Sequence, residues 1–452
     1  MKRFLSLLLA AMMIMGCVSA IAEDAPYTVD GWDIPATGNP FVIYSWNDEF
    51  QGMLQKYYIP AIGGTVNEDG SMVLPNGDPI EYVINPNDNG VYQQALDSAL
   101  QAGTHIDMFL MEADYALKYV DSEYTKDLAT IGVTKEAMEA NQYAYTIDVA
   151  TDSNGVIKGS SWQAAPGLFL YRADLAESIL GVTSPEEMQA KVADWDTFLA
   201  TAREVNEKSE GSTKLIPSVG DVWQVVRVGR ENPWVNDALE LVVDEQVEWY
   251  FNLAKTLREE NLTAEANPWS EAWNAGVGND SIMGYFFSTW GIQWTMVGNS
   301  GGNAPGEGTY GQWRAVNGPQ AYYWGGTWLA ASSTGTNDAV AKDIIEYFTI
   351  NTDSMQDYCV KSKDYVNNKT SIQNIIDAGF GFDFLGGQDH YSLFQAVTPL
   401  IDTSAMSAYD QNINSAMDEQ VNLYMSGEKD YETAIQDFKN AVVDLYPELT
   451  AD

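Results

Sequence analysis

The chain has 452 residues, of which 64 are Asp or Glu and 23 are Lys or Arg, so its formal net charge is −41. Hydrophobic residues make up 45% of the chain and aromatic residues 12%, which is enough for the cores of two or three ordinary domains. So acidic a surface repels phosphate backbones and anionic membranes, and this argues against nucleic acid as a partner.

The first residues have the pattern of an export signal. Met1-Lys2-Arg3 is a charged start, and the apolar run that follows, 4–15, is shorter than the ~20 residues that span a bilayer. Two processing sites stay open: a signal peptide of 1–22, or a lipoprotein signal of 1–16 after which Cys17 carries a lipid. The protein is therefore expected to be exported, and either lipid-anchored at the cell surface or periplasmic.

The arm that follows, 23–35, is punctuated by Pro and Gly and is predicted to be a linker. Cys17 and Cys359 are the only cysteines. Since Cys17 is either removed or acylated, the mature chain cannot close an internal disulfide, and its stability must come from hydrophobic cores.

Strands and helices alternate in the first part of the folded chain. The patterns predict strands over 41–45, 81–84 and 106–111, separated by helices over 49–58 and 91–101. Such alternation favours parallel strands joined by right-handed crossovers, the beginning of a doubly wound α/β sheet.

A polar cluster follows each of these three strands. The first is Trp46-Asn47-Asp48-Glu49, the second lies in 85–90 and includes Asn87 and Asp88, and the third is Glu112-Ala113-Asp114. Capping of the next helix would need one such residue at each place. Several polar residues after every strand instead favour a ligand-binding cleft at the carboxyl edge of the sheet.

Two other sites suggested by sequence patterns lack an essential part. The segment 85–96 begins like a calcium-binding EF-hand loop, but its twelfth position is Leu96 in place of the bidentate Glu. Gly298-Asn299-Ser300-Gly301-Gly302 matches a nucleophile elbow, but no long helix can start after it and the chain has only two histidines. No metal and no cofactor are expected.

Later segments combine aromatic residues with glycines or show helical periodicity. The stretch 281–294, with Trp290 and Trp294, has no clear amphipathic period and is expected to expose its rings as a binding surface, and 318–330 has the same two ingredients. Helices are expected over 238–257 and 337–348, and a last one ends before Pro447.

The order of these features resembles the extracellular solute-binding proteins of bacterial carbohydrate ABC transporters, of the family 1 and maltose-binding kind. The resemblance rests on Trp46 to Phe50, on 107–112, on 166–174 reading P-G-L-F-L-Y-R-A-D, on 194–198 and on Gly325-Gly326-Thr327-Trp328. It implies an α/β, two-lobed periplasmic-binding-protein-like fold of type II, in which each lobe is a doubly wound sheet flanked by helices and the ligand cleft lies between the lobes.

The resemblance also implies how the chain is divided between the lobes. Crossings are placed near 162–167, 318–322 and 361–368. Lobe one would hold 36–162 and 322–362, and lobe two would hold 163–321 and 363–452.

The implied ligand is a carbohydrate, and the implied partners are the permease subunits of an ABC importer; the protein itself would be a monomer without enzymatic activity. The apolar face of a pyranose covers an indole ring, and its hydroxyls donate to carboxylates and amides. The expected contact residues are Trp46, Asn47, Asp48, Glu49, Asn87, Asp88, Glu112, Trp162, Trp290, Trp294, Trp324, Trp328 and Gln388. A secreted glycoside hydrolase stays open as an alternative, since it needs the same residue types, and so does a cell-surface adhesin.

Overall fold

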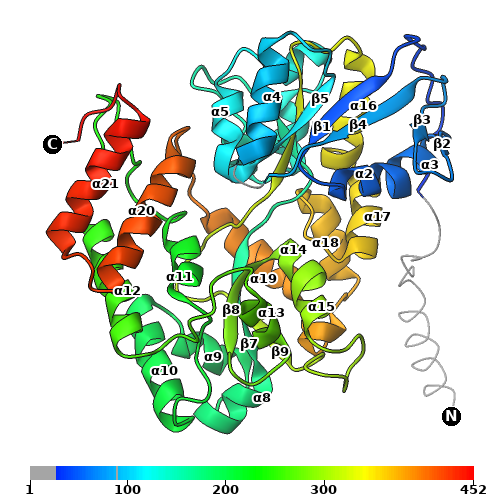
Figure 1. Ribbon diagram of the computed structural model, residues 1–452. Coiled ribbons are helices and arrows are strands. Elements are labelled where there is room, and N and C mark those ends of the chain that lie inside the picture. The colour runs from blue at the N-terminus through cyan, green and yellow to red at the C-terminus, as the bar shows by residue number, and fades with distance from the viewer. Residues whose placement is uncertain (1–26, 88–89, 452) are drawn as a thin grey trace, which may run out of the picture.

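Two lobes, each built on a β-sheet, make up the computed structural model, which describes residues 27–87 and 90–451 (Figure 1). The export signal, Cys17 and Asp88 lie outside the described residues. Within the described part, no helix is both long enough and apolar enough to span a membrane.

The sheet of lobe one has seven strands in the order β2-β3-β4-β1-β5-β10-β6. Their bounds are β1 Phe41–Ser45, β2 Thr65–Val66, β3 Met72–Val73, β4 Pro79–Ile84, β5 Met108–Glu112, β6 Ser160–Ser161 and β10 Thr327–Ala331. β1 lies parallel to both β4 and β5, which confirms the predicted parallel start of the sheet. β10 arrives from much later in the chain and pairs antiparallel with β5 and β6.

The helices of lobe one cover both faces of this sheet. They are α2 Glu49–Met53, α3 Ile59–Ala61, α4 Val91–Gln101, α5 Ala116–Val120, α6 Lys135–Asn141, α7 Ala144–Asp148 and α16 Asp338–Thr349. The predicted helix over 49–58 forms, because a π-helical turn at Leu54–Tyr58 joins α2 to α3. α4 has the predicted bounds and buries Tyr92, Leu96 and Leu100, which are four residues apart.

A buried carboxylate fixes the start of β5. Asp107 accepts hydrogen bonds from the backbone amides of Val42, Thr336 and Asn337 at 2.9–3.1 Å. It thereby joins the first strand to the turn that leads into α16. Each of these amides would otherwise be a donor without a partner in the protein interior.

The sheet of lobe two has three strands, β7 Gly167–Arg172, β8 Gly284–Ser288 and β9 Trp313–Val316, in the order β8-β7-β9. All of them pair antiparallel, whereas the parallel pairs of this lobe are single bridges at Lys214, Ile216 and Glu240. These neighbours are too short to form strands of a wound sheet. β7 and β8 are buried along their whole length.

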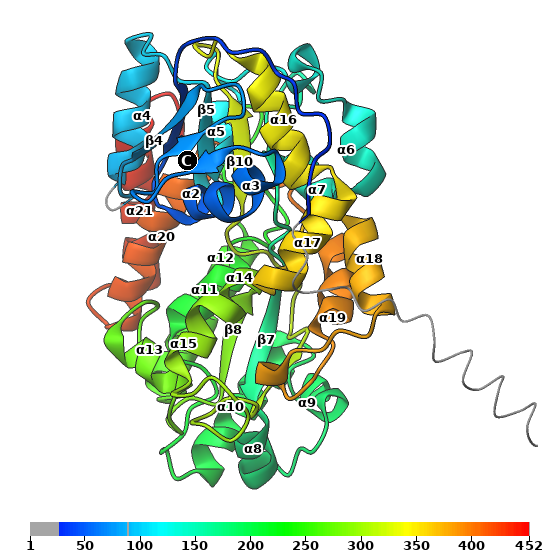
Figure 2. The same ribbon diagram turned by 90° about the vertical axis from the view of Figure 1, so that its right-hand side faces the viewer.

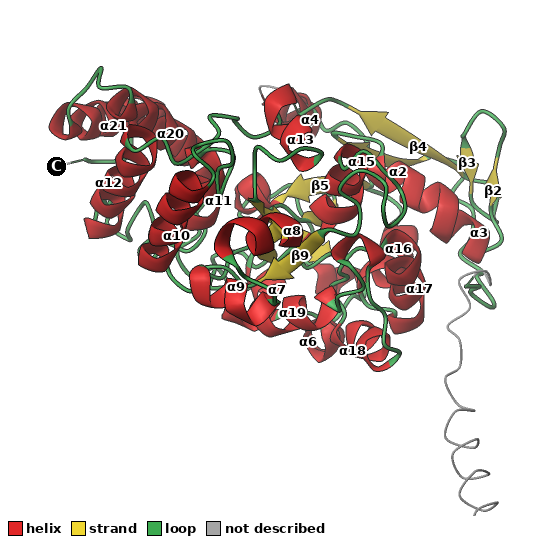
Figure 3. Ribbon diagram, turned by 90° about the horizontal axis from the view of Figure 1, so that it is seen from below, coloured by secondary structure: helices red, strands yellow, loops and turns green. Residues whose placement is uncertain are grey.

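Lobe two is mostly helical, and some of its helices lie around this small sheet while α20 and α21 lie away from it (Figure 2). They are α8 Ala173–Leu175, α9 Pro185–Lys191, α10 Trp195–Lys208, α11 Val219–Val226, α12 Glu245–Glu259, α13 Glu271–Val277, α14 Thr289–Gly291, α15 Val297–Asn299, α20 Asp410–Met425 and α21 Tyr431–Leu445. α12, α20 and α21 pack together at one end of the molecule (Figure 3). From α16 the chain descends to lobe two through α17 Thr352–Ser362, α18 Lys369–Asp377 and α19 His390–Val397 (Figures 1 and 2).

Two expectations for lobe two were wrong. The helix expected over 238–257 begins only at Glu245, since Asp244 caps its N-terminus and the preceding residues form a turn. The rings of 285–287 were expected to be exposed, but they are buried in β8. A strand buried on both faces has no period in its hydrophobicity, which explains the misleading pattern.

The three segments expected to be crossings between the lobes lie side by side. Segment 162–167 hydrogen bonds to 365–367 on one side and to 322–324 on the other, at N···O distances of 2.8–3.2 Å. The ring of Tyr322 covers Gly167 so closely that a Cβ there would lie 1.9 Å from a ring carbon. The three segments expected to connect the lobes therefore form one small, tightly packed bundle.

Candidate functional site

A cavity of about 1010 Å³ lies between the lobes. This is the upper end of the ~300–1,000 Å³ range of small-molecule sites. Its lining comprises Trp46, Asn47, Asp48, Glu49, Gly52, Met53, Lys56, Tyr57, Asn87, Glu112, Asp114, Gln163, Trp269, Trp290, Gln293, Trp294, Trp324, Gly325, Gly326, Thr327, Tyr358, Lys361, Ser362 and Lys363. Indoles, carboxyls and amides dominate this set.

The lobe-one wall is formed by the exits of three parallel strands. β1 leads into 46–49, β4 leads to Asn87 and β5 leads to Glu112 and Asp114. Because β4, β1 and β5 run in one direction, their carboxyl ends meet at the same edge of the sheet. The structure thus brings together the three polar clusters that the sequence places after these strands.

Trp46 is held in place by two tyrosine rings. Tyr92 and Tyr115 meet it edge-on, with ring centroids 5.6 and 6.2 Å from that of Trp46. Both tyrosines are buried in the core of lobe one. The indole is partly buried and lines the cavity in a fixed position.

Two carboxyl groups with raised pKa values lie at the same wall, Glu49 in the lining of the cavity and Asp364 buried beyond it. Burial, with the charges of Asp364 and Asp48, raises the pKa of Glu49 to about 7. Burial also raises the pKa of Asp364 to about 6, although Asp364 accepts hydrogen bonds from Gln163 at 3.1 Å and from Thr289 at 2.9 Å. Glu49 is therefore protonated in part of the molecules near neutral pH, and its carboxyl group can both donate and accept hydrogen bonds.

Glu112 and Asp114 form a second acidic pair at the exit of β5. Burial and the nearby charge of Asp114 raise the pKa of Glu112 to about 8. One Glu112 oxygen accepts a hydrogen bond from the backbone amide of Asp114 at 2.8 Å. Asp114 itself forms an ion pair across the lobes with Arg227, which follows α11, at 3.1 Å.

The lobe-two wall is aromatic. Trp290 is clamped, because its Nε1 donates to the carbonyl oxygen of Trp324 at 2.8 Å. Trp324 stacks on Phe287 of β8, with centroids 5.1 Å apart. Trp294 is 63% exposed and Trp269 is 52% exposed, and both line the cavity.

Three of the residues expected to contact ligand lie elsewhere. Trp162 stacks on Phe50 in the core of lobe one, and Trp328 is buried there with its Nε1 donating to the carbonyl oxygen of Thr146. The side-chain amide of Gln388 exchanges two hydrogen bonds with the backbone of Ala315 in lobe two. Each of these side chains is engaged within the protein, so the expectation of ligand contact is corrected.

Several cavity residues were not anticipated from the sequence. They are Lys56, Tyr57, Gln163, Trp269, Gln293, Tyr358, Lys361 and Lys363. Some of them had a positional signal: Gln163 lies in the first expected crossing, Lys361 and Lys363 lie in the third, and Gln293 lies in the stretch 281–294. Lys56, Tyr57, Trp269 and Tyr358 lie on helices or loops in which no pattern separates a cavity side chain from an ordinary surface one.

Comparison with known proteins identifies the family. The sequence profile of the family described as bacterial extracellular solute-binding protein matches residues 76–378, which is more than half of the chain. The chain belongs to the bacterial extracellular solute-binding proteins. No curated protein sequence matches it.

Solved structures of solute-binding proteins have the same fold. An extracellular solute-binding protein of family 1 superimposes with a TM-score of 0.73 at 18% identity, over 89% of this chain and 99% of the other. The ABC transporter associated binding protein of B. animalis subsp. lactis Bl-04 gives 0.68 at 16% identity, over 92% and 99%. The galacto-N-biose-/lacto-N-biose I-binding protein of Bifidobacterium longum gives 0.69 at 13%, over 94% and 100%. This solute-binding protein thus has the type II periplasmic-binding-protein fold.

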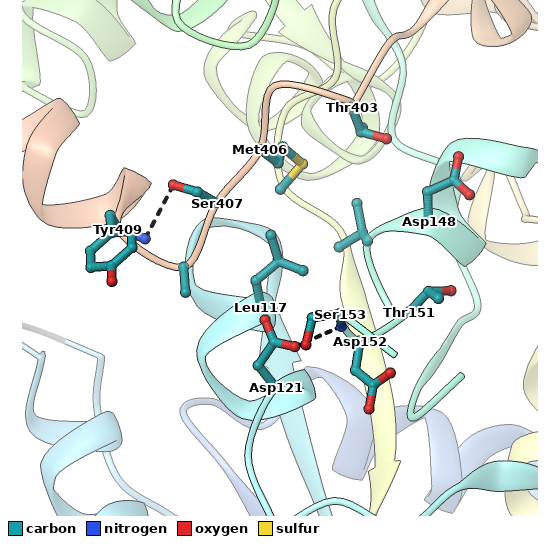
Figure 4. A pocket seen from close by; sticks show the side chains of 12 residues that line it. Leu117, Asp121, Asp148, Thr151, Asp152, Ser153, Thr403, Met406, Ser407 and Tyr409 are labelled. Atoms are coloured by element: carbon teal, nitrogen blue, oxygen red, sulfur yellow. Dashed lines mark hydrogen bonds between the residues drawn. The ribbon is translucent and has the colours of Figure 1, made fainter. Parts of the chain in front are cut away.

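A second cavity of about 480 Å³ lies between α5, the turn after α7 and segment 403–409 (Figure 4). Two of its aspartates already stabilise turns. Asp121 accepts from the amide of Ser153, and Asp152 accepts from two backbone amides and pairs with Lys158. We assign no ligand to this cavity.

No group of three or more His, Cys, Asp or Glu side chains in the described part of the chain has the arrangement of a metal site. Ser300 of the formal elbow motif is buried, and its hydroxyl donates to the carbonyl oxygens of Val297 and Gly302. It is therefore not presented as a nucleophile.

Proposed function

We propose that this solute-binding protein captures a carbohydrate between its lobes and delivers it to an ABC importer. The observation that carries this proposal is the composition of the interlobe cavity, in which tryptophan rings from both lobes face the same space as carboxyl and amide groups. Apolar sugar faces cover indole rings, and sugar hydroxyls suit carboxylates and amides.

The polar groups of the cavity are sufficient in number for micromolar binding. Hydrogen bonds to charged groups contribute ~1.5–3 kcal/mol each, so about three of them, with stacking, balance the ~8 kcal/mol of a micromolar complex after ordering costs. On the lobe-one wall Asp48 supplies a carboxylate, and Glu49 and Glu112, whose raised pKa values leave them partly protonated near neutral pH, supply carboxyl groups that donate as well as accept hydrogen bonds.

Similar proteins bind sugars, which supports the carbohydrate assignment. The Bifidobacterium longum protein is described in complex with lacto-N-biose, and the B. animalis protein in complex with β-1,6-galactobiose. A Thermotoga maritima protein with the same fold, at a TM-score of 0.64, is described as maltose-bound.

We further propose that lobe one comprises 36–162 and 322–362, that lobe two comprises 163–321 and 363–452, and that ligand binding closes the lobes about the three crossings. The hydrogen bonds among the crossings support this division. Closure would give the permease subunits a signal that the site is occupied. Export, with either cleavage after residue 22 or lipidation of Cys17, and a monomeric state are part of the same proposal.

Calorimetric titration of the mature protein with a glycan panel tests the function, and the panel includes lacto-N-biose, β-1,6-galactobiose and maltose. We expect stoichiometric binding accompanied by a change in tryptophan fluorescence, with the sugar recovered intact. Release of shorter products would instead support the glycoside hydrolase. No binding to any sugar of the panel would reject the carbohydrate assignment.

A further inference from the structure

Trp269 is the unusual residue of the lobe-two wall. It lies immediately before the N-cap of α13, lines the interlobe cavity and leaves 52% of its surface exposed. Its neighbour Trp290 is only partly exposed. Exposed apolar surface that is gathered in a groove, as the rings of Trp269 and Trp294 are here, marks a ligand-binding site.

Trp290 has little free surface, because other rings already contact it. Trp269 lies almost parallel to it, at an interplanar angle of 14° and a centroid distance of 6.0 Å. Phe287 and Trp324 approach it edge-on, at angles of 77° and 79°. Its Nε1 is already bonded to the protein. Trp290 therefore supports other rings, and Trp269 covers part of it.

The backbone at Trp269 is strained. Its φ is +68°, in the left-handed region that bulky side chains rarely adopt. The next residue, Ser270, caps α13 by accepting a hydrogen bond from the amide of Trp273 at 3.2 Å, and this cap does not need a tryptophan before it. A strained, half-exposed aromatic residue at a ligand cavity is the type of outlier that points to function.

We propose that Trp269 is the ring on which a sugar stacks in lobe two, and that Trp290 and Trp324 position it. This rests on the proposed carbohydrate-binding function. Trp324 meets Trp269 edge-on, with centroids 5.8 Å apart, so Trp269 is braced by rings on two sides. The sugar would thus meet a platform whose orientation is fixed before binding, which lowers the entropy lost on association.

Oxidative footprinting of the wild-type protein tests this assignment without any substitution. Tryptophan oxidation is mapped by mass spectrometry with and without saturating lacto-N-biose, β-1,6-galactobiose or maltose. We expect Trp269 to be oxidised rapidly without sugar and to be protected by the sugar that binds, while Trp290 reacts slowly in both states. Protection of Trp290 with unchanged oxidation of Trp269 would overturn the assignment.

Substitution gives a second test. Trp269→Ala should weaken binding of the same sugar at least about tenfold, which corresponds to about 1.4 kcal/mol, and Trp269→Phe should retain part of the affinity. The matched control is Leu239→Ala, because Leu239 also has a positive φ, +62°, and is 43% exposed, but does not line the cavity. The control should bind like the wild type.

The outcomes separate the two proposals. If the wild-type protein binds a sugar and Trp269→Ala binds it equally well, only the role of Trp269 is overturned. If the wild-type protein binds no sugar of the panel, both the carbohydrate function and the stacking role of Trp269 are rejected. Urea midpoints show whether Trp269→Ala is folded, and Trp269→Phe decides the question if it is not.

Discussion

We expect Glu49→Gln to flatten the pH dependence of the protein's stability. In the wild type, burial and the charges of Asp364 and Asp48 raise the pKa of Glu49 from 4.5 to about 7. The folded protein therefore holds this proton more tightly than the unfolded chain does. Between these two values the unfolded chain has released a proton that the folded state keeps, so the free energy of unfolding falls as the pH rises.

The magnitude follows from the difference between the two pKa values. At ~1.36 kcal/mol per pH unit, a rise from 4.5 to about 7 corresponds to at most about 3 kcal/mol. Because Glu49 opens onto the interlobe cavity, water and ions weaken the effect, and we expect about 1–2 kcal/mol. This stability is fully present below pH 4.5 and is lost as the pH rises through about 7.

Urea unfolding followed by circular dichroism, at several pH values on either side of the wild-type pKa, measures the effect. The wild type should lose more stability than Glu49→Gln as the pH rises, by the amount derived above. Asp221→Asn is the matched control, since burial raises the pKa of Asp221 to about 7 as well, but Asp221 lies in the lobe-two core beside Trp273. Both variants should flatten the stability curve, whereas only Glu49→Gln should alter the pH dependence of sugar binding. Stability profiles of Glu49→Gln and the wild type that run parallel would refute the reasoning.

Three further substitutions test the scaffold. Gly167→Ala should lower the free energy of unfolding by about 1–3 kcal/mol, because its Cβ would overlap the ring of Tyr322, whereas Gly298→Ala, with nothing within 4 Å of its Cβ, should not; urea midpoints compare them. Asp107→Ala should cost about 3 kcal/mol or more in the same assay, since three backbone amides lose their acceptor. Arg227→Gln removes an ion pair between the lobes, so small-angle scattering of the ligand-free protein should show a larger radius of gyration. An unchanged radius would mean that the pair does not hold the lobes together.

The sequence predicted lobe one better than lobe two, for a physical reason. In lobe one the strands of 41–45 and 81–84 alternate with amphipathic helices, and each strand is followed by a recognisable polar cluster. In lobe two, β8 is buried on both faces and is continuous in aromatic residues, so its sequence does not show which rings are exposed. The strand was therefore mistaken for a binding surface.

The sequence also does not show which single tryptophans are buried and which line the cavity. Trp162 and Trp328 lie beside glycines or hydroxyl residues much as Trp324 does, yet both are buried while Trp324 lines the cavity. What separates them is the tertiary partner: Phe50 stacks on Trp162, and Trp328 donates to a backbone carbonyl. Trp269 is the reverse case, since it lines the cavity but was not predicted to do so. The rings that contact it, Trp290 and Trp324, follow it by more than twenty residues, so the local sequence does not reveal the contacts.

Both walls of the cavity are joined to the segments that we propose as crossings between the lobes, so ligand binding would have a direct route to the proposed lobe closure. On the lobe-two side, Trp290 donates to the carbonyl oxygen of Trp324, and the amide of Trp324 donates in turn to Ala165 in the first crossing. On the lobe-one side, the charge of Asp364, which lies in the proposed third crossing, contributes to the raised pKa of Glu49. If the lobes close by changing torsions in these segments, as proposed, closure would move Asp364 relative to Glu49. The pKa of Glu49 is therefore expected to differ between the ligand-free and ligand-bound protein, and proton uptake or release on binding, measured by calorimetry in buffers of different ionisation enthalpy, would report that movement.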